Sequence, residues 1–363
     1  VQKQRLNKFL QRVPRFRRLR KLGISTARIL RTGGKAAMTY GEAIMGVSNA
    51  TLLTQRRAAA AAAAPPSGRG GENLDIALML ADGGPKGGAD PAYDAHTMPV
   101  GEWATAVWEN WLPGPALLRL AATAKLRLAK AKNIWGVCYG PAAALVATCA
   151  RLGWTVCDAY TLLTDEGKEL SLRVDPPAVV VKECKRSVQR WRWRSIEKTM
   201  PRLKDNGTGR GAAMEPIWSL LNSRQNDGDW NAALRGGLRS AIANRQWPQT
   251  RVRAAGWSGH NRCLLCLQTN AEAAGVADGS LDEAVLADTP VGNLGHRIWG
   301  CGHFRAERVS RTTPEQARLW RSGRYAGHPA WERGIAPRPA LPARRRAQAS
   351  SFVWIVRPRD GTL

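Results

Sequence analysis

Two pairs of metal-binding residue types place the strongest constraint on how this chain can fold. Cys263 and Cys266 form a Cys-x2-Cys pair in NRCLLCLQTN, and His296 and Cys301 follow in GHRIWGCGHF, so that the pattern reads C-x2-C-x29-H-x4-C. Zinc prefers four nitrogen or sulfur ligands in a tetrahedron, and a Cys-x2-Cys pair on a tight turn supplies two of them. The pattern therefore predicts a structural zinc site that ties two distant segments together.

The spacing alone leaves alternatives open at this site. Buried thiols beside ordinary histidines would give the same sequence, and His303 can replace His296 as a ligand, with His260 as a second reserve. Residues 267–295 carry five acidic residues and no basic one, which indicates a loop-and-helix insertion between two ligand pairs. Four protein ligands fill the coordination shell of zinc, so such a site is structural. A metal hydrolase built on these histidines would need an open position on the metal.

The charge of the chain predicts a polyanionic partner. Lys and Arg number 55 against 28 Asp and Glu, for a formal net charge of +27, and a protein this basic attracts nucleic acid. Residues 1–35 hold twelve basic residues and no acidic one, and apolar residues recur from Leu6 to Leu19 at helical spacing, with Pro14 expected to kink or divide the helix. This segment is either a solvated basic face or, as we predict, a clamp for the phosphate backbone. The candidate phosphate contacts are Arg12, Arg15, Arg17, Arg18, Arg20 and Lys21.

A second basic segment, residues 182–204, contains the alternating stretch RWRWR. The helical pattern that begins after Pro176 spreads Arg190, Arg192 and Arg194 around its surface, where they would also neutralise phosphates. The two tryptophans of this stretch, Trp191 and Trp193, are either core residues or a platform on which bases stack.

Membrane insertion and a disulfide framework are both disfavoured. No apolar run approaches the ~20 residues needed to span a bilayer, and the N-terminus lacks the apolar core of a signal peptide. Seven cysteines without regular short spacing indicate a reducing, intracellular compartment. Because the chain begins with Val and ends without an obvious terminus, we expect it to be a piece of a longer protein.

The periodicities predict a mainly α fold with helical bundle-like segments, one small β-hairpin and a zinc-stabilised module. The hairpin is expected near residues 154–174, where YTLLT and ELSLRV flank the turn DEG. The expected divisions are a basic helical segment (1–64), a linker and acidic loop (65–100), a helical connection with the hairpin (101–245), the zinc module (246–325) and a Pro/Arg-rich linker into a missing domain (326–363).

The zinc pattern NRCLLCL…LGHRIWGCGHF resembles the C-terminal zinc-binding motif of non-LTR retrotransposon reverse transcriptases, where a Cys-x2-Cys pair precedes a His-x4-Cys pair. The neighbourhood of Tyr40-Gly41-Glu42 is similar to the thumb-like connection after the polymerase palm of that family. VQRWRW and the terminal FVWIVRPRDG are similar to the stretch that leads into its RNase H domain. The resemblance extends over most of the chain, and its specific elements are the zinc motif and the surroundings of Tyr40.

The resemblance implies a parent polyprotein with polymerase and RNase H activities, whose catalytic carboxylates this chain does not carry. Polymerase catalysis needs paired carboxylates for two metal ions, and the chain has no Asp-Asp pair. Asp360-Gly361-Thr362 only echoes the start of an RNase H carboxylate element. The expected function is therefore a non-catalytic segment that grips RNA and DNA templates and contains structural zinc. The alternative is a free-standing structural zinc protein that acts through protein–protein contacts.

Overall fold

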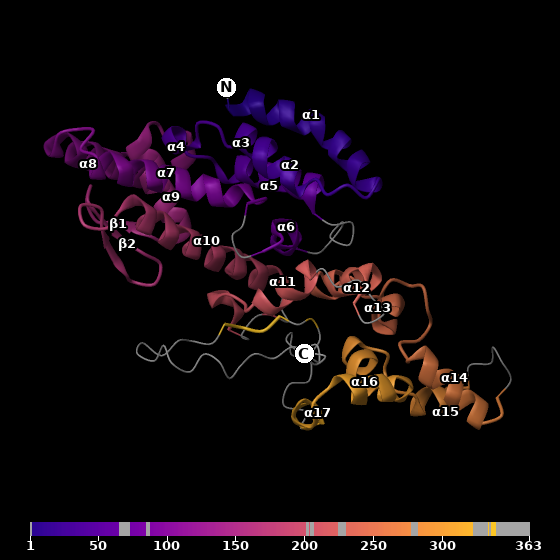
Figure 1. The fold of residues 1–363 in the computed structure, drawn as a ribbon. Helices are drawn as coiled ribbons and strands as arrows, with labels where there is room; N and C mark the ends of the chain where they lie inside the picture. Colours follow the sequence, from indigo (N-terminus) through magenta and orange to yellow (C-terminus); the bar gives the residue numbers. More distant parts are fainter. Residues whose placement is uncertain are drawn as a thin grey trace, which may run out of the picture. The chain divides into compact units, whose positions relative to one another are not determined.

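The computed structural model describes residues 2–64, 73–84, 88–200, 203, 207–223, 230–276, 282–321, 333 and 335–338. Two compact units make up the chain: the first is Val1–Met200 with Gly209–Gly211, and the second is Pro201–Thr208 with Ala212–Leu363. The fold is mainly helical with one small antiparallel sheet (Figure 1), which confirms the predicted fold class.

The first unit contains most of the long helices. In chain order its elements are α1 (Gln2–Lys21), α2 (Ala27–Ile29), the π-helix η1 (Leu30–Gly34), α3 (Lys35–Met38), α4 (Glu42–Met45), α5 (Asn49–Ala63), α6 (Leu74–Asp82), α7 (Pro91–Trp108), α8 (Gly114–Ala129), the 3₁₀ helix η3 (Ile134–Gly136), α9 (Pro141–Leu152), β1 (Thr155–Val156), β2 (Thr161–Leu163), β3 (Glu169–Ser171) and α10 (Pro177–Thr199).

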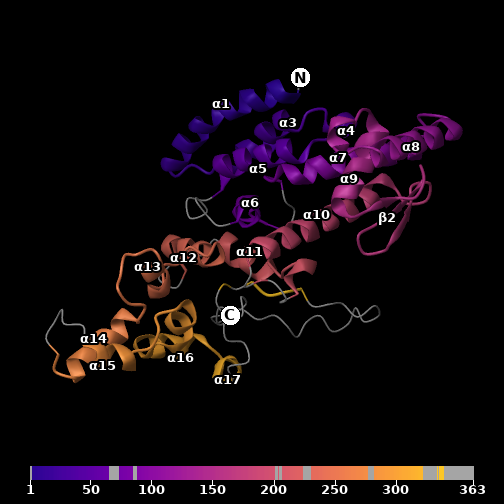
Figure 2. The same ribbon diagram turned by 180° about the vertical axis from the view of Figure 1, so that it is seen from behind.

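Helix α7 is the centre of the first unit, packed by α4, α5, α9 and α10 (Figures 1 and 2). Its first turn is favourable because Asp90 caps it and Pro91 occupies the first helical position, where a missing N–H costs nothing. Trp103 is buried in the largest apolar cluster and its Nε1–H donates to the Ala159 carbonyl at 2.9 Å. This bond fastens the segment before β2 to the central helix.

The N-terminal helix packs its apolar stripe onto the alanine-rich helix α5. Phe9 and Phe16 are buried together in a second cluster, with ring centroids 5.6 Å apart, beside Ala58, Ala59 and Ala62. Small alanine side chains let the two helices approach closely, and Pro14 lies within α1 without ending it. The predicted helical stripe is therefore present, and Pro14 does not divide the helix.

Two arginines and three aspartates form a buried ionic cluster that joins α5, α6, α7 and α10. Arg56 makes two 3.0 Å contacts with the Asp90 carboxylate and also contacts Asp75. Arg192 contacts Asp90 at 3.2 Å, Asp82 at 3.0 Å and the Asp75 carbonyl at 3.0 Å. Burial alone would raise the pKa of Asp90, but the two guanidinium charges hold it below its ordinary value.

The small sheet confirms the predicted hairpin and extends it by one strand. β2 and β3 pair antiparallel, with Leu162 opposite Leu170, and β1 adds to the free edge of β2 in the order β1-β2-β3. Leu162 and Leu170 are both fully buried, which fixes the register because a one-residue slip would turn them to solvent. The third strand was not predicted.

The second unit consists of short helices. They are α11 (Glu215–Asn222), α12 (Ala232–Ile242), α13 (Gln249–Ala254), α14 (Leu264–Ala273), α15 (Glu283–Asp288), the π-helix η6 (His296–Gly300), the 3₁₀ helix η7 (Gly302–Phe304), α16 (Arg305–Arg311) and α17 (Pro314–Arg321); the 3₁₀ helix η5 (Thr208–Arg210) includes residues of both units.

The expected division of the chain needs correction in its middle part. Residues 73–84 and 88–100, expected to be a linker and acidic loop, form α6 and the first half of α7, because their aspartates are buried partners of arginines. The boundary between the two units falls near residue 200, inside the segment 101–245 that was expected to be one helical connection. Residues 65–72 lie outside the described residues, as does the expected linker 326–363 apart from residues 333 and 335–338.

We predict that removing one charge from the ionic cluster destabilises the first unit strongly. Asp90→Asn keeps a side chain that can cap α7 but leaves two buried guanidiniums short of a negative charge, so the free energy of unfolding should fall by about 3–5 kcal/mol. Urea unfolding followed by circular dichroism measures the loss. The control Arg186→Gln breaks an ion pair whose arginine is largely exposed and should cost less than about 1 kcal/mol.

A second prediction concerns Glu42, which is fully buried on α4 and accepts a 2.7 Å hydrogen bond from Gln55 Nε2. Burial raises its pKa from 4.5 to about 8. The folded form therefore keeps a proton that the unfolded chain releases, so this contribution to stability is complete below pH 4.5 and is lost as the pH rises through about 8. In Glu42→Gln the free energy of unfolding should depend less on pH in this range, and the melting temperature at pH 8 should be higher than in the wild type. Identical pH dependence in both proteins would contradict this assignment.

Candidate metal centre and basic surfaces

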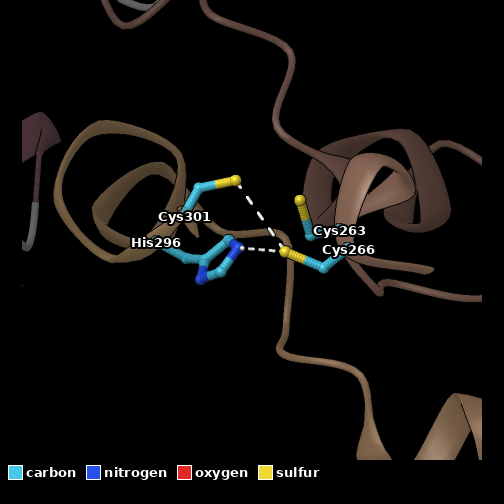
Figure 3. Close-up of side chains that lie close together, drawn as sticks. All are labelled: Cys263, Cys266, His296 and Cys301. Carbon is cyan, nitrogen blue, oxygen red and sulfur yellow. Dashed lines mark hydrogen bonds between the residues drawn. The ribbon is translucent and has the colours of Figure 1, made fainter. Parts of the chain in front are cut away.

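The structure brings the four residues of the predicted metal pattern together in the second unit. The ligand atoms of Cys263, Cys266, His296 and Cys301 all lie within 4.8 Å of one another. Figure 3 shows the two thiols from the start of α14 facing the imidazole and the thiol of the segment around η6. Segments separated by 29 residues therefore meet at one small cluster that could bind a metal ion.

Distances at Cys266 fit the edges of a metal tetrahedron. Its Sγ lies 3.4 Å from His296 Nε2 and 3.8 Å from Cys301 Sγ. Tetrahedral zinc with its usual bond lengths would give edges of about 3.6 Å for sulfur to nitrogen and about 3.8 Å for sulfur to sulfur. The donor set and its spacing thus fit a four-coordinate ion held by protein ligands alone.

The first pair is positioned by a helix start and by backbone pairing. Cys263 is the N-cap of α14, so Cys266 lies in the first turn with its thiol on the same side. The Cys263 N–H donates to Pro290 O at 2.9 Å, and the Gly292 N–H donates to Asn261 O at 2.8 Å. A β-carbon at Gly292 would lie 3.0 Å from the Cys263 backbone, so glycine permits this close approach.

A π-turn positions the second pair. His296 and Cys301 are five residues apart, a spacing that would point them about 140° apart on an α-helix. The chain instead forms the π-helix η6, in which the Cys301 N–H donates to the His296 carbonyl at 2.7 Å. The wider turn returns Cys301 to the side of His296, and Asn293 Oδ1 fixes the start by accepting from the His296 N–H at 2.7 Å. The His-x4-Cys spacing is therefore explained by the local backbone.

The electrostatics of the cluster favour a cation. Burial, together with hydrogen bonds to the thiols of Cys263 and Cys301, raises the pKa of the Cys266 thiol to about 12, since adjacent thiolates repel one another. A bound divalent ion reverses this preference by stabilising thiolates. Burial and the nearby Arg308 lower the pKa of His296, which keeps its imidazole in the neutral form that binds metals. Arg308 also donates to the Cys301 carbonyl at 2.5 Å.

The reserve histidines lie outside the group of four. His303 Nε2 is 3.1 Å from Thr269 Oγ1, and His260 Nδ1 accepts from the Arg262 N–H at 3.2 Å. Among the described residues the structure thus places His296, and neither reserve, beside the three thiols. The contributions of Asn293, Gly292 and Arg308 were not predicted, because no spacing rule identifies residues that hold ligands through the backbone.

The predicted nucleic-acid contacts on α10 are wrong for the residues that the structure buries. Arg192 is 2% exposed and is committed to the ionic cluster, and Trp193 is 4% exposed in the core, so neither can reach a nucleic acid. Trp191 is partly buried against His96, with ring centroids 5.3 Å apart. Arg190 and Arg194 both contact Asp165, whose side chain is 3% exposed, at 2.6 and 3.3 Å. The three arginines of this stretch therefore all pair with carboxylates of the first unit.

Helix α1 carries exposed basic side chains. Arg12, Arg15, Arg17, Arg18 and Lys21 are exposed and are spread over the sides of the helix that do not face α5. Within the described part of the chain none of these five forms an ion pair. Arg20 is the exception among the predicted contacts, because its Nη1 donates to the Ala61 carbonyl at 2.9 Å. Figures 1 and 2 show α1 along an outer edge of its unit.

Comparison with protein-family models, curated proteins and solved structures finds no match to this chain. Among the described residues, every helix is too short or too polar to cross a membrane.

Metal binding is predicted to depend on the four clustered residues and on no other cysteine or histidine. Cys301→Ser and His296→Gln should each lower metal affinity by more than the ~10–100-fold that loss of an outer-shell partner costs. The matched controls are Cys157→Ser, an exposed cysteine outside the cluster, and His303→Gln. Mass spectrometry of the bound metal in the purified proteins gives the answer. Loss of metal in His303→Gln but not in His296→Gln would show that His303, and not His296, is the ligand.

Proposed function

We propose that this chain is a non-catalytic nucleic-acid-binding segment whose second unit is held together by structural zinc. The zinc assignment rests on the donor set, because three thiols and one imidazole within 4.8 Å of one another suit zinc better than the hard cations that prefer oxygen. Four protein ligands leave no open coordination position, so the metal would shape the module and would not activate water.

Binding of nucleic acid is supported chiefly by one observation, the exposed basic surface of α1. Nine basic residues, eight of them exposed, lie on a helix of 20 residues that contains no carboxylate, and the net charge of +27 adds long-range attraction. Such a helix is about 30 Å long, which lets it follow the phosphates of a duplex or a folded strand. The contacts would be to the backbone, so they would give affinity without sequence specificity.

The resemblance to non-LTR retrotransposon reverse transcriptases makes the proposal more specific. The order Cys-x2-Cys then His-x4-Cys is the order in that family's zinc motif, and the clustering of all four side chains supports the same site here. We therefore propose that the chain comes from the region between the polymerase palm and RNase H of such a polyprotein. Its role would be to grip template RNA and DNA while other segments carry the catalytic carboxylates.

Affinity for nucleic acid should fall steeply with salt. The logarithm of the binding constant should decrease against the logarithm of salt concentration with a slope of about −0.7 to −0.9 for each phosphate contacted. Arg15→Gln combined with Arg18→Gln should weaken binding to duplex and single strand alike. The slope should become shallower by up to the amount that about two phosphate contacts contribute. Fluorescence anisotropy with labelled oligonucleotides at several salt concentrations measures both quantities.

The control for this experiment is Lys168→Gln, which removes a positive charge that lies 3.4 Å from Glu183. It should leave the slope and the affinity nearly unchanged. Salt-independent binding, or an equal effect of the control and of the α1 variants, would refute the phosphate clamp. Absence of binding together with specific capture of a protein would favour the alternative of a zinc protein that acts through protein contacts.

A further inference from the structure

Two solvent-exposed tryptophans of the second unit stack on each other. The rings of Trp247 and Trp257 have centroids 4.8 Å apart and are inclined by only 10°. Their exposed fractions are 48% and 72%, although tryptophan is among the side chains that gain most from burial. An aromatic pair that the fold orders but does not cover is typical of a surface that meets a partner.

The backbone around α13 holds this pair in place. Trp247 precedes Pro248, the N-cap of the helix, and Trp257 follows its C-terminal turn. Gly256 adopts the left-handed conformation (φ 76°), and the Trp257 N–H then donates to the Val252 carbonyl at 3.1 Å. This pattern is a Schellman motif, which turns the chain back along the helix it ends. Both ends of a short helix thus carry one tryptophan each, and the stack is preorganised.

All acidic and basic side chains in the sequence around the pair are basic. Residues 230–262 contain six arginines and no carboxylate. The Arg251 guanidinium lies 5.8 Å from the centre of the Trp247 ring and donates to the Asn244 carbonyl at 2.6 Å, so it is held beside the stack. Arg253, on the same short helix, is exposed. Burial and the neighbouring Arg235 lower the pKa of Arg239, a sign that like charges crowd this segment.

We propose that the Trp247–Trp257 pair is a stacking platform for an unpaired base of single-stranded nucleic acid. The base would continue the stack on the more exposed ring, that of Trp257, while Arg251 and Arg253 neutralise adjacent phosphates. Stacking on an indole needs a free base face, which a duplex does not offer, so the platform selects single strands. The inference rests on the proposed nucleic-acid function and assigns part of it to the second unit.

Positive charge selects nucleic acid over a protein as the occupant. A protein partner would have to be acidic to meet six arginines without a carboxylate, whereas every nucleic acid carries one negative charge on each phosphate. The exposed Trp111 of the first unit provides the contrast, since its Nε1–H donates to Glu109 at 2.7 Å and that carboxylate would repel phosphate. Trp111 is therefore a matched control: an exposed tryptophan without the cationic surroundings.

The test compares Trp257→Ala, Trp257→Phe and Trp111→Ala in the full chain, each checked for unchanged metal content and circular dichroism. The probes are a fluorescein-labelled oligothymidylate of about 16 nucleotides and a duplex of the same length. Trp257→Ala should weaken single-strand binding by between about 5- and 150-fold, the range that loss of one stacked base gives. Trp257→Phe should recover most of this loss because a phenyl ring still stacks, and Trp111→Ala should match the wild type on both probes.

The outcomes separate this inference from the proposed function. Salt-dependent binding of both probes by the wild type, with no change in Trp257→Ala, overturns the platform and leaves the phosphate clamp of α1 in place. Equal losses of Trp257→Ala on the duplex and the single strand, without recovery in Trp257→Phe, also overturn it, because the residue then acts on folding or charge. A wild type that binds neither probe overturns both proposals.

Discussion

The first unit depends on the compensation of two buried positive charges. Arg56 and Arg192 lie on helices α5 and α10, far apart in sequence, and three aspartates from α6 and α7 surround them. An isolated guanidinium in an apolar interior would cost several kcal/mol, so neither helix can occupy its position until the acidic pair of helices is in place. The ion pairs therefore constrain how the four helices pack, because each buried arginine must lie beside the aspartates of α6 and α7.

The part of the second unit around the metal cluster relies on a different constraint, because its helices bury few side chains. The helices nearest the metal cluster, α13, α14 and α16, contain no buried residue within the described part of the chain. Short amphipathic helices without a core are unstable alone. A metal ion with four ligands supplies binding free energy that a small apolar cluster cannot. It would join the start of α14 to the turn at η6, and the backbone pairing of Cys263 with Pro290 extends that link.

These two constraints explain why the sequence predicted one site well and another badly. The metal pattern is nearly local: each pair of ligands lies within one turn, and its residue types have few other uses. The partners of Arg192 are not local, since Asp82 lies 110 positions away. From sequence alone an alternating Arg-Trp helix is compatible with a nucleic-acid surface and with an ion-paired interior, and the acidic segment looks like a loop. Recognising that the two stretches neutralise each other requires the tertiary fold.

The pairing of buried arginines with buried aspartates also determines which positive charges stay exposed to solvent. Carboxylates are used up in the interior of the first unit, so its outer surface is more basic than its composition implies. Among the described residues of the first unit the buried acids are Glu42, Asp75, Asp82, Asp90 and Glu183, against the buried cations Arg56 and Arg192. Exposed cations of the first unit lie on α1 and also on and just after α8, two stretches without any carboxylate, and the second unit adds the arginines around α13, of which Arg253 is exposed. On the proposed function, these are the stretches where phosphates would meet each unit, because no carboxylate there repels them.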